Sequence, residues 1–300
     1  MTAVDPTIAT AAAPRFRRAN PVLAFIRFQP LGTAGLLVIL VMATAAVFAD
    51  VIAPYDPEAI DFAAMLTAPS WEHPFGTDAF GRDILTRIIY GARTALTIGF
   101  VSSFTGCSIG AVIGVTSAYF GGRVDLVIQR FIDILLSYPI IVLALVVVAV
   151  VGHRPVGGID VNLILAIAIP IIPRVARVVR SSALAIREMP YVDAARAGGY
   201  SDGHIIFRHM LPNVLAPYLI MLTAYVAQAI LLEASLSFLG LGVSEPKPAW
   251  GLMLSGDSSN FYQEAPWMII FPGAAISLAV FSFNLFGDSL RDWLDPKFKT

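Results

Sequence analysis

Six long apolar runs fix what this 300-residue sequence can fold into. They cover about residues 31–48, 94–120, 132–151, 163–179, 214–239 and 267–286. A transmembrane helix needs roughly 20 mostly apolar residues, and these runs are close to that length or longer. Each run is continuously apolar rather than alternating, so helices that satisfy their own backbone hydrogen bonds are expected in lipid. The sequence therefore predicts an all-α membrane protein with six transmembrane helices.

Composition agrees with a single membrane-embedded domain. Hydrophobic residues make up 57% of the chain and charged residues 14%, whereas soluble domains have roughly 45–50% and about 25%. We expect one six-span domain over 31–290, between tails at 1–30 and 291–300, with a long polar loop at 50–93. The only cysteine, Cys107, lies in an apolar run, which excludes an intrachain disulfide.

Lysine and arginine are distributed unevenly between the two sides of the predicted bundle. If both termini share one side, the segments on that side hold 15 of the 20 basic residues. Basic residues in short loops favour the cytoplasmic side of a membrane. We therefore expect both termini, and the segment between the fourth and fifth spans, in the cytoplasm, with the 50–93 loop outside.

The apolar runs carry little that suggests catalysis. Ser108 lies in a Gly-Cys-Ser-Ile-Gly match to the nucleophile-elbow pattern, which needs a strand–turn–helix context and here falls in an apolar helix. The four histidines fall in predicted loops or at their edges, so none is well placed to activate Ser108 and an intramembrane enzyme is disfavoured. No His-Glu-x-x-His metal motif occurs, and none of the three lysines follows a glycine, as a P-loop requires. No cofactor or metal is expected in this chain.

Acidic residues near the apolar runs are the candidates for a pathway or an outer gate. Asp133 lies near the cytoplasmic end of the third span, where an ion pair with Arg130, one turn away, is expected. Glu233 lies towards the outer end of the fifth span and either lines the pathway or bonds to the adjacent outer loop. Asp78 and Asp83, in the outer loop, could bind a cation, although solvated loop acids are the commoner case. So few acids at membrane depth argue against a proton-coupled carrier.

Two features of the second span concern packing. Gly106, Gly110 and Gly114 follow one another at four-residue spacing, which predicts a close contact with another helix. Before this span, apolar positions between Ile84 and Ile89 predict a short helix lying at the outer membrane surface.

The polar segment 180–212 is expected to fold as a helical hairpin. Pro190 suits the first turn of a helix that Gly198-Gly199 ends. Asp202 is placed to cap a second short helix over 203–210, which Leu211-Pro212 stops.

Such a hairpin suits docking to a soluble partner. It would present Ala194, Ala195, Tyr200 and Ile205 to a groove, because helix-in-groove docking is a common mode of recognition. The alternative is a plain loop whose arginines only fix the orientation of the chain.

The hairpin also resembles a known motif. Asp193-Ala194-Ala195-x3-Gly199-x9-His209-x-Leu211-Pro212 resembles the E-A-A-x3-G-x9-I-x-L-P loop of permease subunits of ABC importers. Asp193 replaces the usual glutamate and keeps its charge, whereas His209 replaces the usual isoleucine and puts a polarisable ring on the docking surface. The segments 73–96 and 231–242 resemble the C-type permease of dipeptide, oligopeptide and nickel importers, so the resemblance covers about residues 30–297.

This resemblance implies a six-span subunit of the bacterial inner (cytoplasmic) membrane, paired with a second, similar permease. Two ATPase subunits, which hold the ATP and magnesium, would grip the hairpin, and an extracytoplasmic binding protein would deliver the cargo; membrane lipid is a partner and nucleic acid is not. The residues that would meet the ATPases are Asp193, Ala194, Ala195, Gly199, His209, Leu211 and Pro212. The implied cargo is a dipeptide or oligopeptide. Nickel and glutathione stay open within the same class, and a stand-alone secondary carrier is the alternative outside it.

Overall fold

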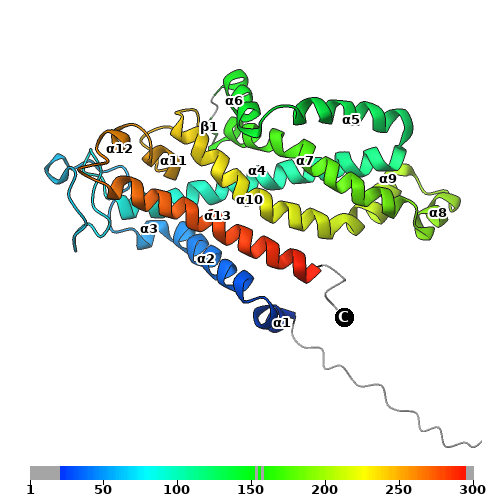
Figure 1. Cartoon of the computed structure of the whole chain (residues 1–300), viewed down its shortest axis with the longest axis horizontal. Coiled ribbons are helices and arrows are strands. Elements are labelled where there is room, and N and C mark those ends of the chain that lie inside the picture. The colour runs from blue at the N-terminus through cyan, green and yellow to red at the C-terminus, as the bar shows by residue number, and fades with distance from the viewer. Residues whose placement is uncertain (1–20, 153–154, 157–158, 295–300) are drawn as a thin grey trace, which may run out of the picture.

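The computed structural model describes residues 21–152, 155–156 and 159–294, and within them the chain is almost entirely helical. Five long helices run along one another (Figure 1): α2 (Pro30–Val47), α4 (Ile84–Phe120), α7 (Val161–Arg187), α10 (Leu215–Phe238) and α13 (Trp267–Leu294). Each is long and apolar enough to span a membrane, α10 together with the helical turns that precede it. The prediction of an all-α membrane protein is confirmed.

The remaining span is a bent pair of helices. α5 (Gly122–Leu136) and α6 (Ile140–Val151) meet at an angle of 94°. A single third span over 132–151 is therefore too simple. The break falls at Tyr138-Pro139, because proline lacks a backbone N–H and disfavours helical geometry in the residue before it. Among the described residues, five helices are long and apolar enough to span a membrane, and the bent pair would make a sixth span if it counts as one.

Shorter elements gather at the two ends of the bundle (Figure 1). At one end, the hairpin end, lie α8 (Pro190–Ala197) and α9 (Asp202–His204), with α1 (Pro21–Phe28) and the end of α13 on that side. At the other, the loop end, lie α3 (Ala49–Ile52), the 3-10 turn η1 (Phe62–Ala64), α11 (Trp250–Met253) and α12 (Asp257–Asn260). The two-residue strands β1 (Pro155–Val156) and β2 (Ile159–Asp160) pair antiparallel before α7.

The predicted surface helix over 84–89 does not exist as a separate element. These residues form the first turns of α4, a continuous helix of 37 residues. Ile84 is buried, and a Cβ added at Gly91 would lie 2.6 Å from the ring of Trp250 in α11. The loop-end segments cover this part of α4, so its apolar side packs against protein.

The glycine face of α4 packs on α7 as predicted. A Cβ added at Gly106, Gly110 or Gly114 would lie 2.8, 2.7 or 2.5 Å from the carbonyl oxygens of Ala168, Ile172 or Ala176, respectively. Only glycine permits so close an approach of the two backbones. The contact joins α4 and α7 along most of their shared length.

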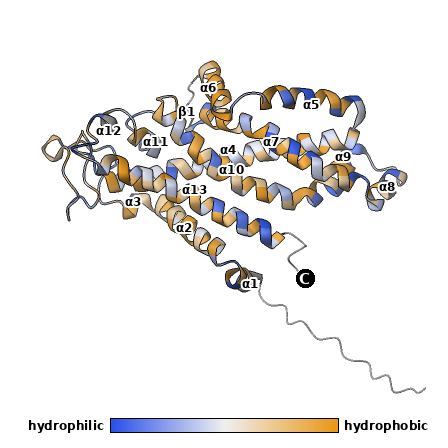
Figure 2. Ribbon diagram, in the orientation of Figure 1, coloured by the Kyte–Doolittle hydropathy of each residue, from blue (hydrophilic) through white to orange (hydrophobic). Residues whose placement is uncertain are grey.

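Two apolar clusters form the interior. One lies between α4, α6, α7 and the hairpin, and the other joins α2, the first half of α4, α10, α11 and α13. Large apolar side chains are also exposed on the outside of the long helices, among them Leu37 and Val41 of α2 and Leu278 and Phe281 of α13. Figure 2 shows the hydrophobic colouring that runs along much of α2. Such a surface suits contact with lipid or with other membrane helices.

Candidate functional site

The first half of the hairpin folds as its sequence predicts. Pro190 occupies the first turn of α8, where its missing N–H costs no hydrogen bond. The helix ends at Gly198, and Gly199 has a φ of 77°. The N–H of Tyr200 then donates to the carbonyl of Ala195. Gly199 therefore supplies the left-handed residue that turns the chain back.

The second half differs from the prediction in two ways. Ser201, not Asp202, caps α9, because the Ser201 hydroxyl accepts the N–H of His204. Leu211-Pro212 does not stop the helix: after α9 the chain continues through the π-helical turn η2 (Ile205–Met210) and the 3-10 turn η3 (Leu211–Val214) into α10. Pro212 lies in the first turn of η3, where a proline is tolerated.

The two helices of the hairpin bury one face and expose the other. Ala195 and Ile205, predicted to face a partner, are 5% and 1% exposed and pack into the cluster around α4 and α7. That prediction was wrong because the small apolar residues on this side of the hairpin pack against the bundle and are not free to meet a partner. Asp193, Ala194, Gly199, Tyr200 and Pro212 are exposed, and Leu211 and His209 are half-buried.

Tyr119, at the end of α4, fastens the hairpin to the bundle. Its hydroxyl donates to Asp202 over 2.6 Å, and the Arg196 guanidinium carbon lies 5.2 Å from the centre of its ring. Arg187, at the end of α7, donates to the carbonyl of Ala118 over 3.0 Å. We call Tyr119, Asp202 and Arg196 the clasp. It ties both halves of the hairpin to one point on α4.

An ion pair holds α5 beside the clasp. Asp125 of α5 accepts two hydrogen bonds from Arg180 of α7, at 2.6 and 2.5 Å, and a third from Ser117 of α4 at 2.5 Å. Further along α5, Asp133 pairs with Arg177 of α7 and not with Arg130 as predicted. Arg177 is the partner because α7 runs alongside α5 and brings its guanidinium to the carboxylate. Both pairs therefore link helices rather than turns of one helix.

The hairpin also carries a small group of rings. The Tyr200 and His204 rings stack with centres 4.7 Å apart, and His209 lies 5.5 Å from His204. The Nε2 atom of His209 is buried and has no hydrogen-bond partner within the described residues. His209 is thus half-buried and packs against the rings of Tyr200 and His204.

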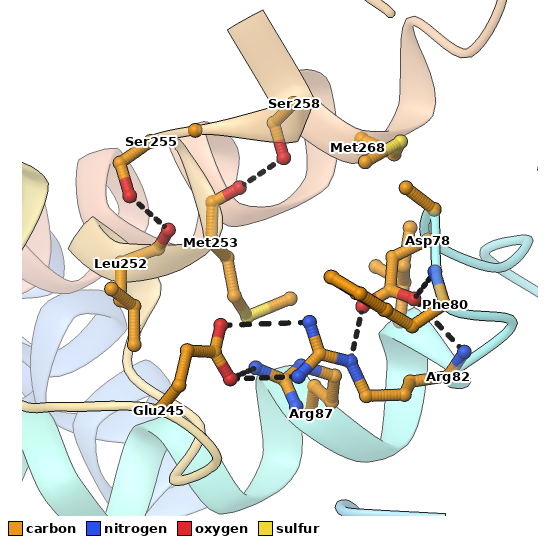
Figure 3. A pocket seen from close by; sticks show the side chains of 13 residues that line it. Asp78, Phe80, Arg82, Arg87, Glu245, Leu252, Met253, Ser255, Ser258 and Met268 are labelled. Atoms are coloured by element: carbon orange, nitrogen blue, oxygen red, sulfur yellow. Dashed lines mark hydrogen bonds and ion pairs between the residues drawn. The ribbon is translucent and has the colours of Figure 1, made fainter. Parts of the chain in front are cut away.

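At the loop end, three charged side chains from residues 78–87 and one from the distant Glu245 meet around a cavity of about 260 Å³. Arg82 donates to Asp78 over 2.6 Å and to Glu245 over 2.7 Å, and Arg87 lies 3.6 Å from Glu245 (Figure 3). Burial disfavours the charge on Arg82, yet Glu245 and Asp78 raise the pKa of its guanidinium above the ordinary value. Arg87 also donates to the carbonyl of Pro57, so this cluster joins the 50–83 loop, α4 and the segment after α10.

Asp78 and Asp83 are structural in this arrangement. Asp83 caps α4 by accepting the N–H of Thr86 over 2.8 Å, and it lies 3.0 Å from Nδ1 of His73. The two carboxylates are only 8% and 3% exposed, so the expectation of solvated loop acids was wrong. Across the residues that the structure describes, no three His, Cys, Asp or Glu side chains are grouped as metal ligands would be.

The remaining polar candidates lie between helices. Glu233 is fully buried, and one of its oxygens accepts the hydroxyl of Ser237, which in turn accepts the N–H of Val243 in the following loop. Of the two alternatives for Glu233, the bond to the outer loop is thus present, through Ser237. Ser108 lies 3.0 Å from the hydroxyl of Tyr218, inside a continuous helix. His153 lies outside the described residues.

Sequence reasoning missed the clasp and the charge cluster. The four-residue spacing of Asp78 and Arg82 was a usable local signal for their ion pair. Tyr119 and Asp202 are 83 residues apart, and Arg82 and Glu245 are 163 apart. No local pattern connects partners so distant in one sequence.

Comparison with known proteins places this chain in a family. Residues 110–300 match the model of the family described as binding-protein-dependent transport system inner membrane component. Residues 24–69 match the N-terminal TM domain of oligopeptide transport permease C.

Individual relatives align along most of the chain. The dipeptide transport system permease protein DppC of Alkalihalophilus pseudofirmus is 44% identical over 92% of this chain and 88% of its own length. The glutathione transport system permease protein GsiD of Pectobacterium atrosepticum is 40% identical over 92% of this chain and 90% of its own length. The probable D,D-dipeptide transport system permease protein DdpC of Escherichia coli is 39% identical over 91% of this chain and 89% of its own length.

A solved structure shares the fold. A chain from the inward-facing MetNI methionine ABC transporter aligns with 71% of this chain and 98% of its own, with a TM-score of 0.53 and 20% identity. The family models, the relatives and the helical bundle agree with one another. This chain is a member of the binding-protein-dependent transport system inner membrane component family, a permease of the dipeptide and oligopeptide type of ABC importer.

Proposed function

We propose that this chain and a second, similar permease form the pathway by which short peptides enter the cell across the bacterial inner membrane. Two cytoplasmic ATPases, which bind the ATP and magnesium, drive the movement by binding the hairpin. An extracytoplasmic binding protein delivers the cargo to the loop end. In this arrangement the hairpin end faces the cytoplasm, with both termini on that side.

The hairpin is the observation that carries this proposal. Asp193 and Ala194 are exposed on α8, and Gly199 and Pro212 are exposed beside them. The same hairpin is fixed to α4 by the clasp and is continuous with α7. A force applied to the exposed side therefore acts on two spans at once, as a subunit without its own ATP site requires.

Peptide cargo is supported by the relatives. Those named for dipeptides and those named for glutathione, itself a short peptide, are similar to this chain at 39–44% identity. Glutathione is therefore the second candidate for the cargo. Nickel is the alternative that the same class of importer leaves open.

Reconstitution tests the proposal. Vesicles that hold the complete complex should accumulate radiolabelled L-alanyl-L-alanine only when ATP and the binding protein are supplied on the proper sides. Excess glutathione and nickel, added separately, identify the preferred cargo by competition.

Vesicles holding this chain alone provide the control. They should accumulate no dipeptide under a proton or sodium gradient. Accumulation by the chain alone would show a secondary carrier and would overturn the proposal.

A further inference from the structure

A groove runs between α10 and α13 on the outside of the bundle. It has a volume of about 660 Å³, and Leu231 of α10 and Ser277, Phe281 and Asn284 of α13 are among the residues that line it. Asn284 and Ser277, which both line the groove, are exposed along the same side of α13. This is the α10–α13 groove. It combines apolar walls with polar groups.

Asn284 lies near the middle of the bundle's length, on its outer surface. Gly287 packs against Thr223, and the hydroxyl of Ser103, in the middle of α4, donates to the carbonyl of Tyr225. These contacts place Asn284 near the middle of α4. At about 1.5 Å per residue, Asn284 is about 26 Å from Trp267 and about 15 Å from Leu294 along α13. The groove therefore carries this carboxamide at the depth of the hydrocarbon.

The polar groups of the groove have no hydrogen-bond partner among the described residues. Neither Asn284 nor Ser277 forms a hydrogen bond through its side chain. An unbonded amide in hydrocarbon is strongly unfavourable. Facing lipid would leave that cost uncompensated.

Other outward faces of the bundle differ. α2 exposes Leu37, Leu40 and Val41, and its Thr44 hydroxyl is satisfied by the carbonyl of Leu40. α4 exposes Phe100 and Phe104. Neither α2 nor α4 contains an asparagine or a glutamine. Of these faces, the α10–α13 groove is the one that exposes a carboxamide, which calls for water or a polar ligand.

We propose that the α10–α13 groove forms a wall of the translocation pathway and that Asn284, with Ser277, binds the peptide backbone of the cargo. This inference rests on the proposed function. A carboxamide both donates and accepts, and so does a peptide bond, so the two are complementary whatever side chains the peptide carries. A neutral amide and a hydroxyl would hold peptides of different sequence weakly and similarly, which suits a path that releases what it binds.

Thiol labelling in the assembled transporter tests the location of the groove. The lone Cys107 is fully buried, so single cysteines can be introduced into the wild-type background. Asn284→Cys and Ser277→Cys should react with a charged, membrane-impermeant methanethiosulfonate about tenfold or more faster than Leu40→Cys, because thiolates form in water and not in lipid. L-Alanyl-L-alanine supplied with the binding protein should slow the reaction of Asn284→Cys. If cysteines at positions 284 and 40 react equally slowly, the groove is not part of a water-filled pathway. If the dipeptide leaves the labelling of Asn284→Cys unchanged, Asn284 does not contact the cargo.

Transport kinetics test the chemistry. Asn284→Leu should raise the KM for dipeptide uptake about 3- to 10-fold, the loss expected for one net hydrogen bond, and Asn284→Gln should restore much of it. Thr44→Val, on the lipid face of α2, is the matched control and should leave KM unchanged. An unchanged KM in Asn284→Leu would contradict the proposal. If the wild-type complex imports no peptide, the proposed cargo fails, whereas the labelling comparison still decides whether the groove is a water-filled pathway.

Discussion

Tyr119 is the residue that most directly fixes the hairpin to the spans. Its hydroxyl meets Asp202 from the second half of the hairpin, and its ring meets Arg196 from the first half. Because both partners are exposed, removing the hydroxyl leaves no charge buried. The contact therefore contributes to the position of the hairpin more than to the stability of the fold.

We expect Tyr119→Phe to reduce dipeptide uptake more than ATP hydrolysis in the reconstituted complex. Losing one hydrogen bond of about 0.5–1.5 kcal/mol loosens the hairpin without unfolding it. The measurement is the number of peptides imported per ATP hydrolysed. Tyr191→Phe removes a hydroxyl from the exposed side of α8 and is the control. An unchanged ratio in Tyr119→Phe would show that the clasp has no part in coupling.

The charge cluster at the loop end should matter for stability. Glu245→Gln leaves the guanidinium of the buried Arg87 without its carboxylate, although the half-exposed Glu245 limits the cost to about 1–3 kcal/mol. We expect a lower midpoint of thermal unfolding in detergent. Glu264→Gln, an exposed glutamate on a neighbouring loop, should leave the midpoint where it is. Equal midpoints for the two variants would refute this account.

Single residues were predictable from the sequence where their partners are local. The turn at Gly199 and the first-turn Pro190 follow from backbone preferences alone. Asp133 and Asp202 were given local roles, an ion pair with Arg130 and a helix cap, and both find partners on other helices. Contacts between helices determine the partners of these two residues, and a single sequence does not reveal such contacts.

Among the elements, α4 and α7 form the most extensive helix pair, and its glycines set the distance between them. Gly110 is the clearest case, because an added Cβ would lie 2.7 Å from the backbone oxygen of Ile172 and 2.9 Å from the Cβ of Val175. Neither atom belongs to a flexible side chain. The two helices must separate to admit even one methyl group.

Gly110→Ala should therefore destabilise the chain by about 1–3 kcal/mol, as overpacking of a close contact does. Gly273→Ala is a matched control, because a Cβ at Gly273 of α13 meets nothing within 4 Å. Alanine there should be neutral or slightly stabilising, since it favours helix over glycine. Thermal unfolding of both variants in the same detergent makes the comparison. Similar midpoints would mean that the glycine face does not control the packing.

The turn between the two helices of the hairpin can be tested in the same way. Gly199→Ala forces alanine to a φ of 77°, at roughly 1–2 kcal/mol, while its Cβ meets no atom within 4 Å. Gly203→Ala adds the same methyl group to ordinary backbone in open space. We expect less ATPase to copurify with Gly199→Ala than with Gly203→Ala, because the turn sets how the exposed side is presented. If both variants copurify with as much ATPase as the wild-type protein does, Gly199 does not have that role.

The positions of the long helices could be predicted from hydrophobicity, but the residues at which they begin and end could not. The apolar runs locate five spans because a helix that crosses the hydrocarbon core must be apolar over roughly 20 residues. The extension of α4 back to Ile84 depends on cover from α11, and the continuation of the helix through Pro212 depends on π and 3-10 turns. A proline at 139 favours a break in the helix, but the angle of 94° between α5 and α6 does not follow from the proline alone.

For the whole molecule, the two ends of the bundle differ in structure. The hairpin lies at one end, the end of α13 points toward that side, and the charge cluster and its cavity lie at the other end (Figure 1). The bias of basic residues predicts that the hairpin end is cytoplasmic. In the proposed function, peptide delivery would take place at the loop end and ATP-driven motion would begin at the hairpin end.

Reporter fusions test this orientation. A fluorescent protein fused after Thr300 should fluoresce, because it folds in the cytoplasm, and alkaline phosphatase at the same point should be inactive. Phosphatase inserted after the exposed Glu72, in the loop at the opposite end, should be active. The reverse pattern would invert the bundle and with it the proposed direction of transport.

The unbroken length of α4 has a mechanical consequence. Its 37 residues begin at the Asp83 cap beside the cavity and finish at Tyr119 and Phe120 beside the hairpin. A rod of about 55 Å that tilts by about 10° around its midpoint displaces each tip by about 5 Å in opposite senses. Because the helix has no joint to absorb the tilt, a push of a few ångströms at the clasp would arrive at the far tip as an equal swing with its direction reversed.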